Sequence, residues 1–191
     1  MGNFYTNIVL KGASRQSVLE LLQGMRRDAF VASPQPDVTV VYDAEADEQN
    51  AEALCELACQ LSRQFDCVAW AVLNHDDDIF WYRLYVAGKA VDEYDSAPGY
   101  FGAAGPSAPA GGDPAKLAGT FGCEASAPAI EAALRKSLLD PGGGVFLASE
   151  RHRQVAEALG LPIGLLALGY NYIEGGDADE LGPGTFVGTN E

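Results

Sequence analysis

The stretch VAWAVLNHDDDIFWYRLYVAGKAVDEYD, residues 68–95, decides the fold of this chain. It contains three runs rich in β-branched and aromatic residues, 68–73, 79–86 and 90–95, and such runs are typical of strands. Polar turns separate the runs, and Gly88 suits a tight turn between the last two. The stretch therefore predicts three antiparallel strands that run up, down and up again.

Acidic residues gather at one end of this predicted meander. Asp76, Asp77 and Asp78 follow the first strand, and Asp95 ends the third strand, with Asp92 shortly before it. Carboxylates held close together repel one another unless a cation or a basic partner neutralises them. Three interpretations stay open: a solvated turn, a rim that binds a basic protein, and a site for a divalent cation.

The metal interpretation would use the oxygen atoms of Asp76, Asp78 and Asp95, with Asp92 in addition and His75 nearby. Hard oxygen ligands of this kind suit Ca²⁺ or Mg²⁺. The run is not an EF-hand loop, because Gly is missing from its sixth position and Glu from its twelfth.

Strand alternation divides the aromatic run 79–86 between two faces of the sheet. The odd-numbered residues Trp81, Arg83 and Tyr85 share one face, and the even-numbered residues share the other. One face must meet the helices, whereas the face with Trp81 is too aromatic to be left in water. We expect residues 115–173, or else a partner, to cover it. Arg83 is expected to pair with Glu93 across the strands.

The residues before this stretch alternate between strand and helix patterns. Strands are predicted over 3–10, 30–33 and 38–42, and apolar stripes at helical spacing predict helices near 14–25 and 50–65. With the first strand of the meander the order is β-α-β-β-α-β. Residues 1–98 therefore predict an α+β domain of the ferredoxin-like, split-βαβ type, an antiparallel sheet with two helices.

The residues after the meander change in character. Residues 99–114 are rich in Gly, Pro and Ala and predict a loop. Residues 115–191 predict a helical extension packed on the first part, with helices over 114–121, 128–139 and 150–159 and a strand over 163–173. The tail 175–191 is acidic and Gly-rich, which favours a loosely held segment.

The overall charge restricts the partners. Asp and Glu number 27 against 12 Lys and Arg, for a net charge of −15. Nucleic acid and anionic membrane surfaces are disfavoured, because binding to them depends on cationic side chains. The sequence shows no secretory signal and no apolar run of membrane-spanning length, so we predict a cytoplasmic protein.

Familiar catalytic and cofactor motifs are missing from the sequence. It has no nucleophile elbow, P-loop or dinucleotide-binding Gly pattern. The four cysteines follow no zinc spacing and are predicted to be small buried residues in a reducing compartment. We therefore expect no cofactor and favour a protein that is not an enzyme.

The pattern NHDDD at 74–78 with DEYDSAPGYF at 92–101 resembles a family of uncharacterised bacterial proteins. MGNFYT at 1–6, ERH at 150–152 and LGLP at 159–162 are similar to the same group. The family carries no assigned activity. The resemblance therefore implies a bacterial cytoplasmic origin and transfers no site residue.

These observations predict a non-catalytic binding or regulatory module, of the immunity-protein kind, that presents an acidic surface to a basic protein partner. The predicted contact residues are His75, Asp76, Asp77, Asp78, Trp81, Asp92, Tyr94 and Asp95. One alternative is a small divalent-metal-dependent enzyme or sensor that uses the clustered aspartates. Another is a homo-oligomer that uses the aromatic face of the sheet.

Overall fold

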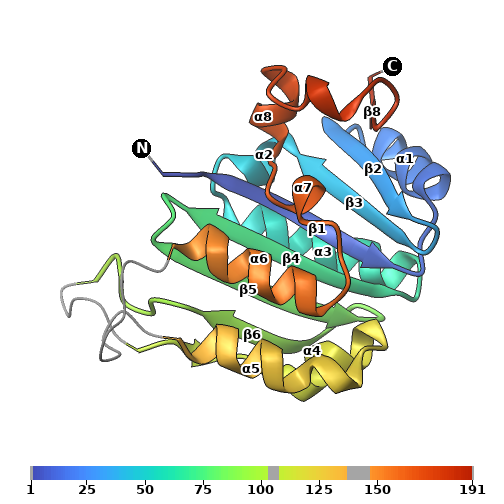
Figure 1. The fold of residues 1–191 in the computed structure, drawn as a ribbon. Helices are drawn as coiled ribbons and strands as arrows, with labels where there is room; N and C mark the ends of the chain where they lie inside the picture. The colour runs from blue at the N-terminus through green and yellow to red at the C-terminus, as the bar shows by residue number, and fades with distance from the viewer. Residues whose placement is uncertain (1, 103–107, 137–146, 191) are drawn as a thin grey trace.

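A computed structural model describes residues 2–102, 108–136 and 147–190 (Figure 1). The described residues form one eight-stranded antiparallel sheet in the order β7-β6-β5-β4-β1-β3-β2-β8, with helices on both faces. The strands are β1 (Tyr5–Lys11), β2 (Ala29–Gln35), β3 (Val38–Asp43), β4 (Val68–His75), β5 (Ile79–Val86), β6 (Lys89–Asp95), β7 (Ala110–Gly111) and β8 (Phe186–Gly188). The helices are α1 (Arg15–Gly24), α2 (Ala44–Asp47), α3 (Ala51–Gln64), α4 (Pro114–Phe121), α5 (Ala127–Arg135), α6 (Ala148–Ala158), α7 (Ile163–Leu166) and α8 (Tyr170–Glu174), with the 3₁₀ turns η1 (Glu124–Ser126) and η2 (Asp179–Leu181).

The centre of the sheet comes from the N-terminal half of the chain. Strands β4, β1, β3 and β2 are neighbours in that order, and α1 and α3 connect them. Both helices begin at side-chain caps: Ser14 accepts a hydrogen bond from Ser17 N, and Asn50 accepts one from Ala53 N. The predicted mixed α+β class is confirmed, but the sheet has more strands than the ferredoxin-like pattern predicts.

The predicted meander is confirmed. β4 pairs with β5 so that His75 lies opposite Ile79, and β5 pairs with β6 so that Trp81 lies opposite Asp95. The turn at 76–78 and the end of β6 therefore lie at the same end of the sheet (Figure 1). The predicted pair also forms, with Arg83 Nη2 2.6 Å from Glu93 Oε2.

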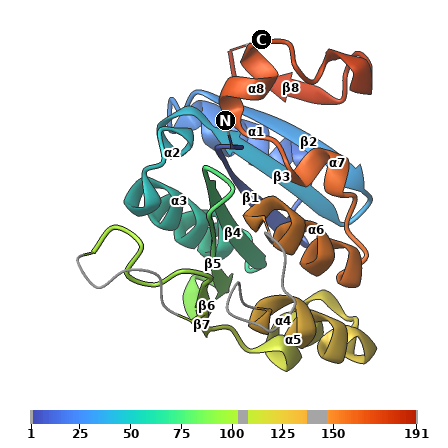
Figure 2. The ribbon, with the colours of Figure 1, turned by 60° about the vertical axis from the view of Figure 1, so that its left-hand side comes forward.

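Helices lie on both faces of the sheet (Figure 2), and each face buries its own cluster of apolar side chains. On one face α1 and α3 bury their apolar stripes against β1, β3 and β4, with Leu54 and Leu61 among the fully buried side chains. On the other face α4, α5 and α6 cover Phe80 and Tyr82 of β5, and α7 lies over β1 and β3. The expectation that the C-terminal segment covers the Trp81 face is therefore wrong. The even-numbered face is the more apolar one, because the odd-numbered face carries the guanidinium of Arg83.

The C-terminal part departs from prediction in a second way. The apolar run 163–173, predicted as a strand, folds into the short helices α7 and α8. The strand comes instead from the tail predicted to be loose, where β8 pairs with residues 30–32 of β2. Thr189 fixes this pairing, because its hydroxyl accepts from Ala29 N at 3.1 Å and donates to Arg27 O at 2.8 Å. The last residues of the helix predicted over 128–139 lie outside the described residues.

The cysteines are all free thiols, but of the four only Cys67 is buried. Within the described residues no helix is both long and apolar enough to cross a membrane.

Candidate functional site

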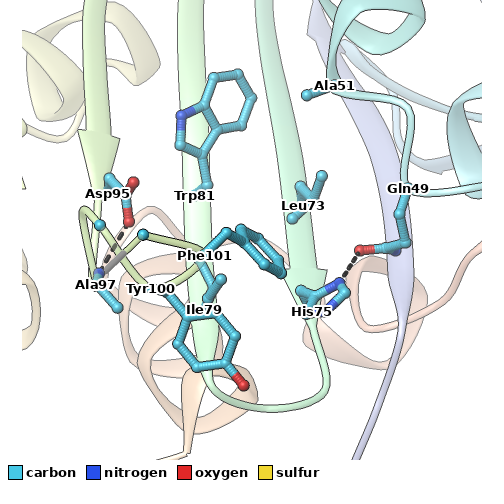
Figure 3. Close-up of a pocket in the computed structure, with 12 residues that line it drawn as sticks. Gln49, Ala51, Leu73, His75, Ile79, Trp81, Asp95, Ala97, Tyr100 and Phe101 are labelled. Carbon is cyan, nitrogen blue, oxygen red and sulfur yellow. Dashed lines mark hydrogen bonds between the residues drawn. The ribbon is translucent and has the colours of Figure 1, made fainter. Parts of the chain in front are cut away.

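A pocket of about 340 Å³ opens on the odd-numbered face of β4 and β5, at the acidic end of the sheet (Figure 3). It lies between the N-terminal end of α3 and the loop 97–102. The other end of α3 is close to the sheet, since Cys59 Sγ lies 3.2 Å from Gly88 O in the β5–β6 turn. At the N-terminal end of α3, beside Ala51, the side chains of Leu73, Ile79 and Trp81 line the cavity.

The loop 97–102 places two aromatic rings at the mouth of this pocket. Its fold is fixed by Asp95 Oδ1, which accepts from Ala97 N at 2.8 Å, and by the bond from Tyr100 N to Ala97 O at 3.0 Å. The Tyr100 hydroxyl donates to Asp78 Oδ2 at 2.7 Å and ties the loop to the acidic turn. Phe101 stays 78% exposed, which is unusual for a large apolar side chain.

His75 lies among aromatic rings on the floor of the pocket. Its ring centroid is 5.0 Å from that of Phe4 and 5.1 Å from that of Phe101, both in edge-to-face geometry. Its Nδ1 lies 3.0 Å from Gln49 Oε1. The Nε2 of Gln49 is buried and has no hydrogen-bond partner among the described residues. This donor is covered by protein and is not exposed to the pocket.

The aspartates of the acidic turn lie together but have separate partners. Asp76 Oδ1 accepts from Gly2 N at 2.9 Å. Asp77 accepts from the backbone N of Asn3 at 3.1 Å and from the side chain of Asn74 at 3.3 Å. Burial would raise the pKa of Asp77, but hydrogen bonds from Ser149, Asn3 and Asn74 outweigh it, so the pKa lies below its usual value. Asp77 is therefore a structural anchor, whereas Asp76 and Asp78 are exposed at the rim.

Asp95 is the carboxylate that lines the pocket itself. It is half-buried, and burial raises its pKa above the ordinary value; the backbone hydrogen bond from Ala97 lowers it and the nearby charge of Glu93 raises it. A positive charge placed beside Asp95 would offset that cost of burial.

Two predicted contact residues do not belong to this surface. Tyr94 is fully buried, and its hydroxyl donates to Leu134 O at 2.7 Å beneath α5. Asp92 accepts from the Tyr82 hydroxyl at 2.8 Å and from Asp113 N at 2.9 Å. Both side chains are on the face that α4 and α5 cover, because strand alternation separates them from Glu93 and Asp95.

Sequence reasoning did not assign Gln49, Tyr100 or Phe101 to the site. The signal for the two aromatics was available, because two large rings within a Gly- and Pro-rich loop are unusual. Gln49 gave no signal, since its role depends on a left-handed backbone conformation with φ 61°. Trp81, His75 and Asp95 were predicted, and the structure brings all three to one pocket.

The pocket combines apolar walls with few polar groups, a lining that ligand sites commonly have. Its walls are aromatic and aliphatic, and Asp95 and Gln49 supply a charged and a polar group that can fix a ligand's orientation. Across residues 2–102, 108–136 and 147–190, no group of three or more His, Cys, Asp or Glu side chains is placed to hold a metal ion.

Comparisons with known protein families, curated proteins and solved structures give no significant match. The resemblance carried by residues 74–78 and 92–101 therefore stays a prediction.

Proposed function

We propose that this protein is a non-catalytic binding module, regulatory or immunity-like, that takes a basic protein partner at the acidic end of its sheet. The observation that carries the proposal is the placement of Phe101, an exposed ring over an aromatic pocket, in a loop that Tyr100 ties to the exposed Asp78 of the acidic turn. As part of this proposal, β4, β1, β3 and β2 with α1 and α3 are a ferredoxin-like unit, to which β5 and β6 add the binding surface.

Charge supports a basic partner. The net charge of −15 would attract a cationic protein over a distance of about 8 Å at physiological salt. Such steering raises the association rate, and the affinity then depends on a few buried anchors. Aromatic side chains are the commonest anchors, and Tyr100, Phe101 and Trp81 are clustered at this end.

The proposal can be tested with a nine-residue arginine peptide and a nine-residue citrulline peptide of the same shape without charge. We expect calorimetric binding of the arginine peptide at low salt, weakening steeply between 20 and 200 mM salt as exposed charges are screened (roughly tenfold or more). The double substitution Asp76→Asn and Asp78→Asn should weaken binding at least fivefold (about 1 kcal/mol). Asn retains an acceptor for Gly2 N and for the Tyr100 hydroxyl, so the fold is expected to stay intact.

A matched control removes two exposed carboxylates elsewhere, Glu20→Gln in α1 and Glu124→Gln in η1. This control has the same change in net charge as the double variant. If both proteins bind the arginine peptide equally well, the acidic end is not the docking surface and the proposal is wrong. Failure of the wild-type protein to bind the peptide would also overturn it.

A further inference from the structure

We propose that the pocket receives the side chain of a single arginine from the basic partner, with its guanidinium beside Asp95 and its aliphatic stem against Leu73 and Ile79. This inference rests on the proposed function and names the group that the site recognises. A cavity of about 340 Å³ is at the small end of ligand pockets and fits one long side chain.

The arrangement of the walls matches the two parts of an arginine side chain. Leu73 and Ile79 offer aliphatic surface, and Trp81 and Phe101 offer aromatic rings, in the lining of the same pocket (Figure 3). A guanidinium is planar and weakly hydrated, so it stacks on aromatic rings more readily than an ammonium does. The protein already uses this contact, since the guanidinium of Arg83 lies 5.5 Å from the centre of the Trp81 ring.

Asp95 provides the charge that the guanidinium requires. One of its oxygens is held by Ala97 N, and Figure 3 shows the other directed away from that bond. The carboxylate is half-buried and lies opposite Trp81 in the strand pairing. A guanidinium here would gain a charge-assisted hydrogen bond together with the ring contacts.

The occupant is an arginine within a polypeptide because the inference rests on a basic protein partner. Gln49 lies across the pocket from Asp95 (Figure 3), and its Oε1 is 3.0 Å from His75 Nδ1. Asp95 is therefore the polar group of the pocket that is left to meet the guanidinium.

A second copy of this chain is a poor donor of that arginine. Two copies would each carry a net charge of −15 and repel one another. Arg27, Arg135 and Arg153 are moreover engaged in ion pairs within the chain. The charge of the molecule therefore favours a partner of the opposite sign.

The test uses three blocked tripeptides, with arginine, lysine or citrulline between two glycines, and follows the methyl signals of Leu73 and Ile79 and the indole signal of Trp81 by NMR. We expect saturable shifts with the arginine peptide, at least fivefold weaker binding of the lysine peptide and at least tenfold weaker binding of the citrulline peptide. Equal affinity for the arginine and citrulline peptides, or for the arginine and lysine peptides, would overturn the assignment.

Two substitutions locate the contacts. Asp95→Asn retains an acceptor for Ala97 N and should weaken binding of the arginine peptide at least tenfold, and Phe101→Ala should weaken it at least threefold. The matched control is Asp37→Asn, in the exposed turn between β2 and β3, which should leave binding unchanged.

The inference and the proposed function can fail separately. If the nine-residue arginine peptide depends on Asp76 and Asp78 while Asp95→Asn has no effect, the acidic docking surface stands and the arginine pocket is wrong. If the nine-residue peptide binds but the arginine tripeptide gives no shift at Leu73, Ile79 or Trp81, the arginine pocket is again wrong and the acidic docking surface stands.

Discussion

The hydroxyl of Tyr5 in β1 lies 2.8 Å from Nδ1 of His152 in α6, although the two residues are 147 positions apart. His152 is fully buried and stacks on Phe80, with ring centroids 5.1 Å apart, while the Trp70 ring meets it edge to face at 5.4 Å. The bond joins the first strand to the helical layer that covers it. Burial lowers the pKa of His152 to about 3, so the imidazole is neutral at physiological pH.

This burial predicts a loss of stability in mild acid. An unfolded chain protonates His152 near pH 6.5, but the folded protein does so only near its pKa of about 3. Between these values the unfolded state binds one more proton than the folded state. His152 alone should therefore lower the free energy of unfolding by about 1.4 kcal/mol for each unit by which the pH is lowered. Urea denaturation between pH 7 and 3.5 measures the slope.

The variant His152→Gln separates this contribution from that of the carboxylates. It should be less stable than the wild type at pH 7, because Tyr5 loses its partner and the ring packing is lost. The difference should then shrink as the pH falls, since the variant lacks the titrating group. Parallel stability profiles for the two proteins would contradict the assignment.

We predict that the stability of the fold requires glycine at position 169 but not at position 164. A Cβ at Gly169 would lie 2.2 Å from Asp47 Oδ1, whose buried carboxylate accepts from Thr6 N at 2.9 Å and whose Oδ2 accepts from Asn171 N at 2.8 Å. Gly169→Ala should therefore lower the free energy of unfolding by about 1–3 kcal/mol.

Gly164→Ala is its matched control. A Cβ there meets no atom within 4 Å, and the residue is in the helix α7. Both substitutions change the unfolded chain in the same way, so their difference reports the clash with Asp47. We expect Gly164→Ala to be neutral or to stabilise by about 0.5 kcal/mol in thermal or urea denaturation. Equal losses in both variants would show that Asp47 moves without cost.

Asp77→Asn is predicted to destabilise the protein by about 1–3 kcal/mol, because an amide cannot accept all the hydrogen bonds that the carboxylate accepts. Asp78→Asn should cost less than about 0.5 kcal/mol, since Asp78 is exposed. The pKa of Asp77 is lowered in the fold, so its contribution is present above pH 4 and is lost as the pH falls through the folded value. The gap between wild type and Asp77→Asn should therefore narrow below pH 4 in urea denaturation.

The same variant should affect the pocket. Asp77 holds Asn3, and the next residue, Phe4, packs against His75. Loss of this anchor is expected to broaden the NMR signals of the Phe4 and His75 rings. Unchanged ring signals would show that the N-terminal segment is held by other contacts.

The meander could be predicted because the alternation of its side chains and the turn at Gly88 together allow only one register between β5 and β6. That register places Arg83 opposite Glu93, and the predicted ion pair forms. The segment 163–173 could not be predicted, since a short apolar run is compatible with a buried strand or with short helices. In the structure the segment forms two short helices, with Pro162 at the N-cap of α7 and Gly169 at the N-cap of α8.

Part of the pocket lining follows from the sequence, and the rest depends on long-range packing. His75, Trp81 and Asp95 follow from the strand register alone. The sequence does not predict which face of β5 the C-terminal helices cover, because Phe80 and Trp81 are both large and aromatic and lie on opposite faces. The structure decides it through polar groups as well, since the hydroxyl of Tyr82 finds its acceptor on the helical side.

The outermost strands of the sheet have a consequence for self-association. β7 has two residues and β8 has three, so each covers only part of its neighbour. Beyond residue 32, β2 continues through Pro34, which has no N–H to donate, and β6 begins at the exposed, charged Lys89. Charged, proline-bearing and very short edges are poor templates for adding strands from other molecules. The protein should therefore resist amyloid-like stacking at high concentration.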